Sequence, residues 1–190
     1  MKKLICAILA MAMLFALCAC GGSNDNQQAS VADDSLQLLQ KVWATYSDDE
    51  AFPAAGGDFN EENMCMDGPG NFGIDDTDAL DATLALPADA AELIDNAASL
   101  THMMNANTFT AGAFHLADAA NSDELAEALK NSIANRQWMC GMPDEYGIIT
   151  VGDYVISFFG EKDLASTFKD KVLACYEGAQ LVCEEAIVIG

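Results

Sequence analysis

The hydrophobic pattern separates an apolar leader from a longer region of alternating periodicities. Residues 4–17 form an apolar run without a charged residue, preceded by Lys2 and Lys3 and followed closely by the polar residues 21–25. A positive start before about 7–15 apolar residues is typical of a secretory signal peptide. The run falls short of the roughly 20 apolar residues that a membrane-spanning helix needs. We therefore predict that residues 1–19 are a signal peptide.

The end of the leader resembles the lipobox of bacterial lipoproteins, in which a small residue precedes the cysteine that receives diacylglycerol. The matching residues are Leu17-Cys18-Ala19-Cys20, and Cys18 fits less well because the bulky Leu17 precedes it. The resemblance implies a lipid anchor on Cys20 and a lipoprotein of the cell envelope, held at the cell membrane on the extracytoplasmic side. The alternative is an ordinary signal peptide cleaved at an A-x-A-like site without lipidation.

The periodicity after Cys20 predicts a tether followed by one domain. Residues 20–32 are small and polar without an apolar stripe, which is typical of a flexible linker. Removing 19 residues from the 190-residue chain leaves 171, enough for one core, so residues 33–190 are predicted to form a single α/β domain. Asp34 or Ser35 is expected to cap a first helix. Its apolar stripe is Leu36, Leu39, Trp43 and Tyr46.

Residues 47–72 interrupt the periodicity with Pro53, Pro69 and four glycines, so a long loop is expected there. Beyond it, helical and extended patterns alternate. The expected elements are a helix at 87–95, strands at 100–104 and 108–117, a helix at 121–138, strands at 146–151 and 154–159, a helix at 162–177, and a strand at 180–189. Gly152-Asp153 suits the turn of a two-residue hairpin.

From Thr108 onward the expected order is β-α-β-β-α-β, the split arrangement of a ferredoxin-like fold. We therefore predict an α+β fold, a two-layer sandwich in which an antiparallel sheet carries its helices on one face. On the last helix, Cys175 follows Phe168 and Val172 along the apolar face. It should then be buried and react more slowly than Cys65.

A second resemblance covers residues 72–176. Phe72-Gly73-Ile74-Asp75, Met103-Met104-Asn105-Ala106 and Gly152-Asp153-Tyr154-Val155 resemble segments of an uncharacterised family of bacterial lipoproteins. The resemblance implies a lipobox, a spacer and a small α/β domain, without an assigned activity or catalytic residues.

The net charge of the chain restricts the classes of partner that it can bind. Lys2 and Lys3 are the only charged residues of the leader, so the processed chain carries 6 basic and 30 acidic residues, a formal charge of −24. Such an acidic surface repels nucleic acid and anionic lipid head groups. Contact with the membrane is therefore expected through the acyl chains on Cys20 alone.

Sulfur groups near aromatic or imidazole side chains are the most unusual local feature. They occur in Met64-Cys65-Met66, His102-Met103-Met104 and Trp138-Met139-Cys140-Gly141-Met142. Thioethers and thiolates select Cu(I), so converging segments would make a copper site. The competing interpretation is that the methionines fill the core. Cys65, Cys140, Cys175 and Cys183 allow three disulfide pairings, or none, and the sequence leaves these alternatives open.

The remaining motifs point away from an EF-hand and from catalysis, and leave open only weak divalent binding by the acid-rich loop. Asp58, Asn60 and Glu62 have EF-hand spacing, but Asn63 and Pro69 stand where glycine and glutamate are required. The acids Asp75, Asp76, Asp78 and Asp81 also lack ligand spacing. Catalytic motifs are missing, and a Cys140–His115 pair is not brought together by any sequence feature.

We therefore expect a non-enzymatic binding or interaction module without a cofactor, which binds a protein or small ligand through the 47–72 loop. The alternative function is a soft-metal (copper) lipoprotein that uses the Met/Cys segments.

Overall fold

The computed structural model describes residues 30–58 and 60–188 of the chain. The predicted signal peptide and Cys20 lie outside these residues, as does most of the predicted tether. The elements are α2 (Ser35–Trp43), β1 (Ala54–Ala55), β2 (Gly70–Phe72), α3 (Thr77–Leu84), the 3-10 helix η1 (Ala88–Leu93), β3 (Ile94–His102), β4 (Phe109–Leu116), the 3-10 helix η2 (Ala119–Asn121), α4 (Ser122–Ala134), β5 (Glu145–Val151), β6 (Tyr154–Gly160), α5 (Lys162–Cys175) and β7 (Gln180–Ala186). No helix within the described ranges is long and apolar enough to cross a membrane.

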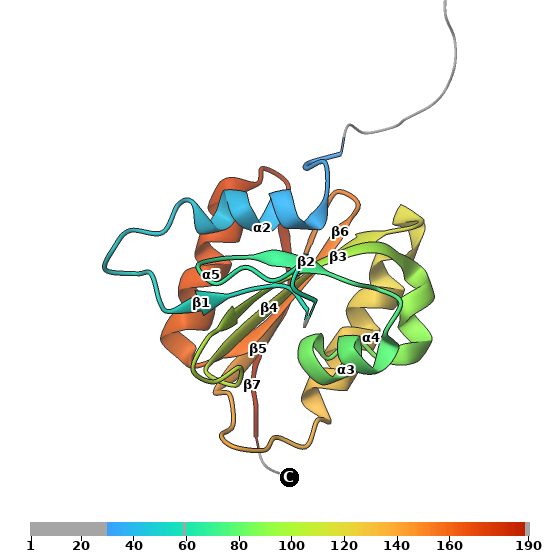
Figure 1. Ribbon diagram of the computed structural model, residues 1–190. Helices are drawn as coiled ribbons and strands as arrows, with labels where there is room; N and C mark the ends of the chain where they lie inside the picture. Colours follow the sequence, from blue (N-terminus) through green and yellow to red (C-terminus); the bar gives the residue numbers. More distant parts are fainter. Residues whose placement is uncertain (1–29, 59, 189–190) are drawn as a thin grey trace, which may run out of the picture.

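The strands form one antiparallel sheet of seven strands (Figure 1). Its order is β1-β3-β4-β6-β5-β7, and β2 pairs with β3 beside β1. The predicted hairpin is confirmed as β5 and β6, joined by Gly152 and Asp153. Gly152 has a φ of 58°, which a residue without Cβ adopts at little cost. The expected α+β class with an antiparallel sheet is therefore correct.

Side-chain alternation along the strands creates two cores, one on each face of the sheet. In β4, Phe109 and Ala111 point into a core shared with α2 and α5, whereas Phe114 and Leu116 point into a core shared with α3 and α4. The cores contain Leu38 of α2 and Leu84 of α3, respectively, each completely buried. Figure 1 shows these helix pairs on opposite sides of the sheet.

The expectation that all helices cover one face, as in a ferredoxin-like sandwich, is wrong. The order β4-α4-β5-β6-α5-β7 is as expected, but β7 pairs with β5, and β3 occupies the edge of β4. The crossover from β4 to β5 through α4 and the crossover from β6 to β7 through α5 therefore move in the same direction along the sheet. Their starting strands, β4 and β6, are antiparallel. Because such crossovers are almost always right-handed, their helices lie on opposite faces. The result is three layers.

The helix expected at 87–95 is only the 3-10 helix η1, and β3 begins at Ile94 rather than at residue 100. Two further helices differ from the sequence expectation. α4 ends at Ala134, four residues before Trp138, so residues 135–144 form an irregular segment. α3 lies where no helix was expected. The side chain of Asp76 accepts a hydrogen bond from the Ala79 amide and caps α3, while Leu80 and Leu84 supply its buried stripe. These two departures shape the pocket described below.

Candidate functional site

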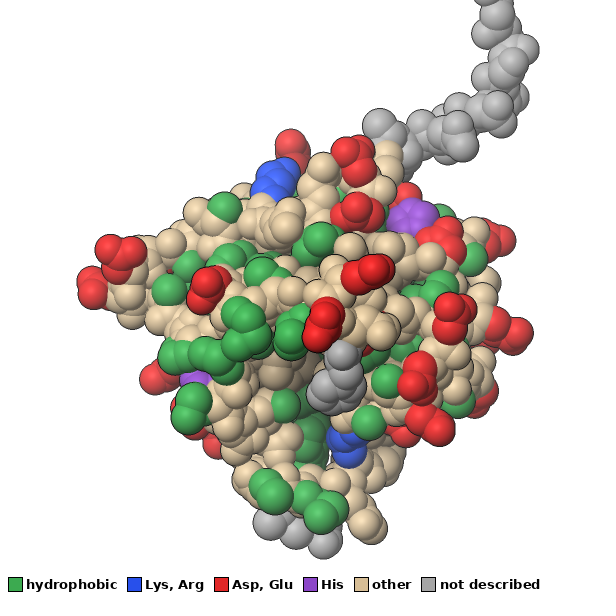
Figure 2. Space-filling model, in the orientation of Figure 1, with side chains coloured by type: hydrophobic (Ala, Val, Ile, Leu, Met, Phe, Trp, Pro, Cys, Tyr) green, Lys and Arg blue, Asp and Glu red, His purple; other side chains and the backbone are tan. Residues whose placement is uncertain are grey.

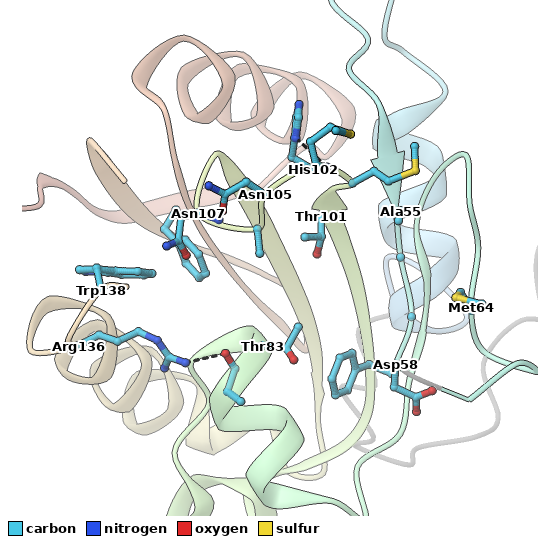
Figure 3. A pocket seen from close by; sticks show the side chains of 18 residues that line it. Ala55, Asp58, Met64, Thr83, Thr101, His102, Asn105, Asn107, Arg136 and Trp138 are labelled. Carbon is cyan, nitrogen blue, oxygen red and sulfur yellow. Dashed lines mark hydrogen bonds between the residues drawn. The ribbon is translucent and has the colours of Figure 1, made fainter. Parts of the chain in front are cut away.

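A pocket of about 400 Å³ opens on the α3 and α4 face, at the end of the sheet where β3 turns into β4 (Figure 3). Segments that are distant in sequence form its walls: residues 55–58, Met64, Phe72, the end of α3, residues 101–107, the segment after α4, and Phe159 of β6. In Figure 3, Trp138 and Arg136 lie opposite Met64 and Asp58. The volume falls within the range of about 300–1,000 Å³ that is usual for ligand sites.

Aromatic rings make the inner wall of the pocket. The ring centroids of Trp138 and Phe159 lie 4.9 Å apart, and Phe159 belongs to the α4-side core. The Trp138 Nε1 atom is buried and meets no hydrogen-bond acceptor in residues 30–58 and 60–188. Packing against Phe159 and Arg136, rather than a hydrogen bond, therefore positions the indole.

Arg136, the only arginine of the sequence, joins the segment after α4 to α3. Its Nη1 atom donates to Asp81 Oδ1 at 3.1 Å and its Nη2 atom donates to the Ala82 carbonyl oxygen at 2.7 Å. The carbonyl ends of a helix carry partial negative charge, which favours a cation at this position. The guanidinium also lies 5.8 Å from the Trp138 ring centroid. Arg136 thus holds two walls of the pocket together.

The turn between β3 and β4 is tied to the 138–142 segment by asparagine side chains. Asn107 Nδ2 donates to the carbonyl oxygens of Met139 (2.7 Å) and Gly141 (2.8 Å), and Asn105 Nδ2 donates to that of Cys140 (3.0 Å). Two of the three sulfur-bearing segments therefore lie side by side.

The third sulfur-bearing segment reaches the same end of the sheet through β1. Cys65 exchanges backbone hydrogen bonds of 2.8 and 2.9 Å with Gly56, directly after β1, and β1 pairs with Thr101 and His102. The pocket is lined by Met64, His102, Met103, Met104 and Trp138 from these segments, but not by Cys65 or Cys140. The sequence features thus meet around a pocket.

Methionine placement contradicts the core-filler interpretation. Three of the nine methionines fall in residues 1–19, and the other six have exposed side chains, between 42% and 78% accessible. They are Met64, Met66, Met103, Met104, Met139 and Met142. Because methionine is normally a buried residue, six exposed copies at one end of a domain need a reason other than packing.

Asp58, a candidate calcium ligand, supports the loop instead. Burial alone would raise its pKa, but hydrogen bonds from Asn60, Asn63 and the Gly73 amide lower the pKa below its ordinary value. Asp58 Oδ2 accepts from Gly73 N and from Asn63 Nδ2, both at 2.9 Å. In the described part of the chain, no three His, Cys, Asp or Glu side chains are grouped to hold a metal ion.

His115 lies at the opposite end of β4, between two carboxylates. Its Nδ1 contacts Asp95 Oδ1, and its Nε2 lies 3.1 Å from Asp153 Oδ2. Burial lowers the pKa of His115, but hydrogen bonds and charges from both aspartates raise it above the ordinary value. The Cys140 carbonyl oxygen accepts a hydrogen bond from Asn105, beyond the other end of β4. At about 3.3 Å per strand residue, that end of β4 is roughly 20 Å from His115. The Cys140–His115 pair considered from the sequence is therefore not assembled.

Cys65, Cys140, Cys175 and Cys183 are all free thiols in the described structure. The expected burial of Cys175 is wrong, because this side chain is only half-buried, with its Sγ 3.9 Å from the Lys41 carbonyl oxygen. Ala165, Phe168 and Val172 are the residues of α5 that are fully covered. Burial raises the pKa of Cys183, which gives that thiol the stronger reason to react slowly.

Sequence reasoning missed Arg136, Asn105 and Asn107 as site residues. Their roles depend on partners 32 to 55 residues away, so local spacing gave no signal for them. Comparison with models of known families, with curated proteins and with solved structures finds no match. The resemblance to a lipoprotein family therefore stays a prediction, and the function must be argued from the pocket itself.

Proposed function

We propose that this chain is a lipid-anchored lipoprotein of the cell envelope, and that its extracytoplasmic domain is a non-enzymatic module that binds an apolar group in the pocket beside Trp138. The pocket carries the binding part of this proposal, and the leader that ends in Leu17-Cys18-Ala19-Cys20 carries the anchor. Trp138, Phe72, Phe159 and three methionines supply its apolar surface, and Asn105, Asn107, Thr83 and Thr101 supply a few polar groups. That mixture is typical of binding sites, where apolar walls give affinity and sparse polar groups give orientation.

The paired state of the charged groups argues for binding rather than catalysis. Arg136 is engaged by Asp81, and Asp58 is saturated with hydrogen bonds. A nucleophile needs an activating base within hydrogen-bonding reach. Cys65 and Cys140 do not line the pocket, and its one histidine, His102, accepts a hydrogen bond from the Met104 amide at 3.3 Å.

The test is binding of Nile red, a neutral apolar dye, to the processed chain with Cys20→Ser, which removes the lipid. Trp43→Phe leaves Trp138 as the only tryptophan, so energy transfer from tryptophan to dye reports this pocket. Thr83→Phe places an aromatic ring in the pocket and should weaken dye binding at least about tenfold, a loss of about 1.4 kcal/mol of binding free energy. Thr150→Phe, on β5 towards the hairpin, is the matched control. Equal dye binding in both variants would refute the proposal.

A second candidate is the soft-metal function. The thioethers of Met64, Met103 and Met104 line one pocket, and thioethers favour Cu(I). His102 is less well prepared, because its Nδ1 already accepts a hydrogen bond from the Met104 amide, which leaves only Nε2 to a metal. Titration with Cu(I) under reducing conditions separates the candidates. Stoichiometric uptake that Met64→Leu with Met103→Leu abolishes would favour the metal, since these changes keep the pocket apolar.

A further inference from the structure

We propose that the partner of this pocket is a positively charged, amphipathic peptide segment, whose apolar side chains enter the pocket while its lysines and arginines face the acids around it. This inference rests on the proposed function and specifies the chemistry of the ligand. It follows from three observations: the exposed methionines around the pocket, the acidic residues on two sides of it, and the lack of an unpaired Lys or Arg among its described lining residues.

The rim consists of the six exposed methionines defined above. Side chains with an unbranched, polarizable thioether adapt their shape to different apolar partners, so exposed methionines are typical of surfaces that bind peptides. Met64, Met103 and Met104 also line the pocket, which makes rim and pocket one continuous apolar surface. Figure 2 shows hydrophobic side chains gathered on the β1 side of the molecule, with acidic groups spread around them.

Acids flank this apolar surface on two sides. Glu61, Glu62 and Asp67 are exposed on the loop after β1, and Asp75, Asp76 and Asp78 are exposed before and within α3. The whole chain has a formal charge of −22. The potential of such a surface attracts cationic partners and repels anionic ones over a Debye length of roughly 8–10 Å.

The described residues that line the pocket offer no free positive charge to an anionic ligand. Arg136 is the only Lys or Arg among its described lining residues, and its charge is balanced by Asp81 at 3.1 Å. A fatty acid or a nucleotide would bring an unpaired negative charge beside Asp58 and Asp81. A peptide with lysine or arginine next to leucine or phenylalanine complements both the apolar and the charged parts of the surface.

The experiment compares three fourteen-residue peptides on the processed chain with Cys20→Ser. The first is a leucine/lysine sequence patterned as an amphipathic helix, the second replaces its lysines with glutamates, and the third has the first peptide's composition in an order that scatters the leucines. Isothermal calorimetry should show the first binding at least about tenfold tighter than the other two, and weakening as salt is raised. Equal affinity for the glutamate peptide or the scattered peptide would overturn the inference.

Matched variants separate docking on this surface from general charge attraction. The combined change Met64→Gln, Met103→Gln and Met104→Gln keeps the net charge and should lower peptide affinity about tenfold or more. Leu181→Gln with Val182→Gln, on the exposed strand β7, is the control and should leave affinity unchanged. Equal loss in both, or no loss in either, contradicts the inference.

The dye and the peptide together separate the two proposals. If Nile red binds at Trp138 but the lysine peptide does not, the inferred partner is wrong and the proposed binding function stands. If neither binds, the proposed function fails as well.

Discussion

The two ends of the sheet differ. At the β5–β6 hairpin end, His115 is paired with two aspartates and residues 30–32 pack against the hairpin. At the β3–β4 turn end, apolar side chains are exposed around a pocket. Ser30 Oγ donates to Asp153 Oδ1 at 3.1 Å and Tyr154 OH donates to the Ala32 carbonyl oxygen at 3.1 Å, so the chain enters the domain beside His115. The turn end carries the six exposed methionines.

This difference separates structural groups from candidate binding groups. His115 is partnered on both ring nitrogens, and such a group has little left to offer a ligand. The methionine side chains at the other end leave water only when something covers them. The described part of the chain therefore begins at the hairpin end and not at the pocket.

The largest expected effect concerns the anchor. Cys20→Ala removes the only cysteine that follows a small residue at the end of the leader, so labelling with a radioactive fatty acid should be abolished. Cys18→Ala is the control and should be labelled normally. Retained label in Cys20→Ala would mean that Cys20 is not the acylated residue.

The next effect compares the two cores. Leu84→Ala on α3 and Leu38→Ala on α2 each delete a completely buried side chain and should each cost about 2–5 kcal/mol of unfolding free energy. Only Leu84→Ala should also weaken Nile red binding, because α3 forms a wall of the pocket. Urea denaturation and dye titration measure the two quantities. Weaker dye binding in both variants would mean that the pocket does not depend on the α3 side alone.

A smaller effect is expected at the turn. Asn107→Ala removes the hydrogen bonds to the Met139 and Gly141 carbonyl oxygens, each worth about 0.5–1.5 kcal/mol net. Amide hydrogen exchange in residues 138–142 should become faster, while exchange at the hairpin end stays the same. Asn131→Ala, which removes an exposed bond on α4, is the control. Unchanged exchange in residues 138–142 would show that this tie does not hold the segment in place.

The smallest effect is the pH dependence from His115. Its folded pKa is above the ordinary 6.5, so protonated His115 stabilises the fold below pH 6.5, and this contribution is lost as the pH rises through the folded pKa. Because the group is partly solvent-exposed, the contribution should be no more than about 1 kcal/mol. Melting curves of the chain and of His115→Gln between pH 5.5 and 8.5 should converge at high pH. A difference in melting temperature that stays constant with pH would show that the contacts of His115 with Asp95 and Asp153 do not couple its protonation to folding.

The sequence predicted features that depend on local periodicity and missed those that depend on long-range pairing. Asp34 caps α2 and Gly152 turns the hairpin as expected, because a cap and a tight turn are set by neighbouring residues. The positions of the helices on opposite faces depend on β7 pairing with β5, which periodicity does not encode. The short, acid-rich α3 was overlooked although Leu80 and Leu84 lie one turn apart.

The pocket shows the same division. The sequence singled out the three sulfur-bearing segments, and the structure brings them to one end of the sheet. The expectation that methionine fills the core failed, because it followed the usual behaviour of the residue type rather than the position of each side chain. The role of Arg136 depends on its hydrogen bonds to Asp81 and Ala82, which precede it by 55 and 54 positions in the sequence. Such contacts become visible only in the folded structure.

Methyl NMR of methionine tests the binding role of the turn end most directly. After removal of residues 1–19, all six methionines of the chain lie at this end, so a spectrum labelled only at methionine methyl groups reports on the proposed site alone. Addition of the leucine/lysine peptide should shift the Met64, Met103 and Met104 signals, with smaller changes at Met66, Met139 and Met142. Binding of the peptide with all six methyl signals unchanged would contradict the assignment of this end as the binding surface.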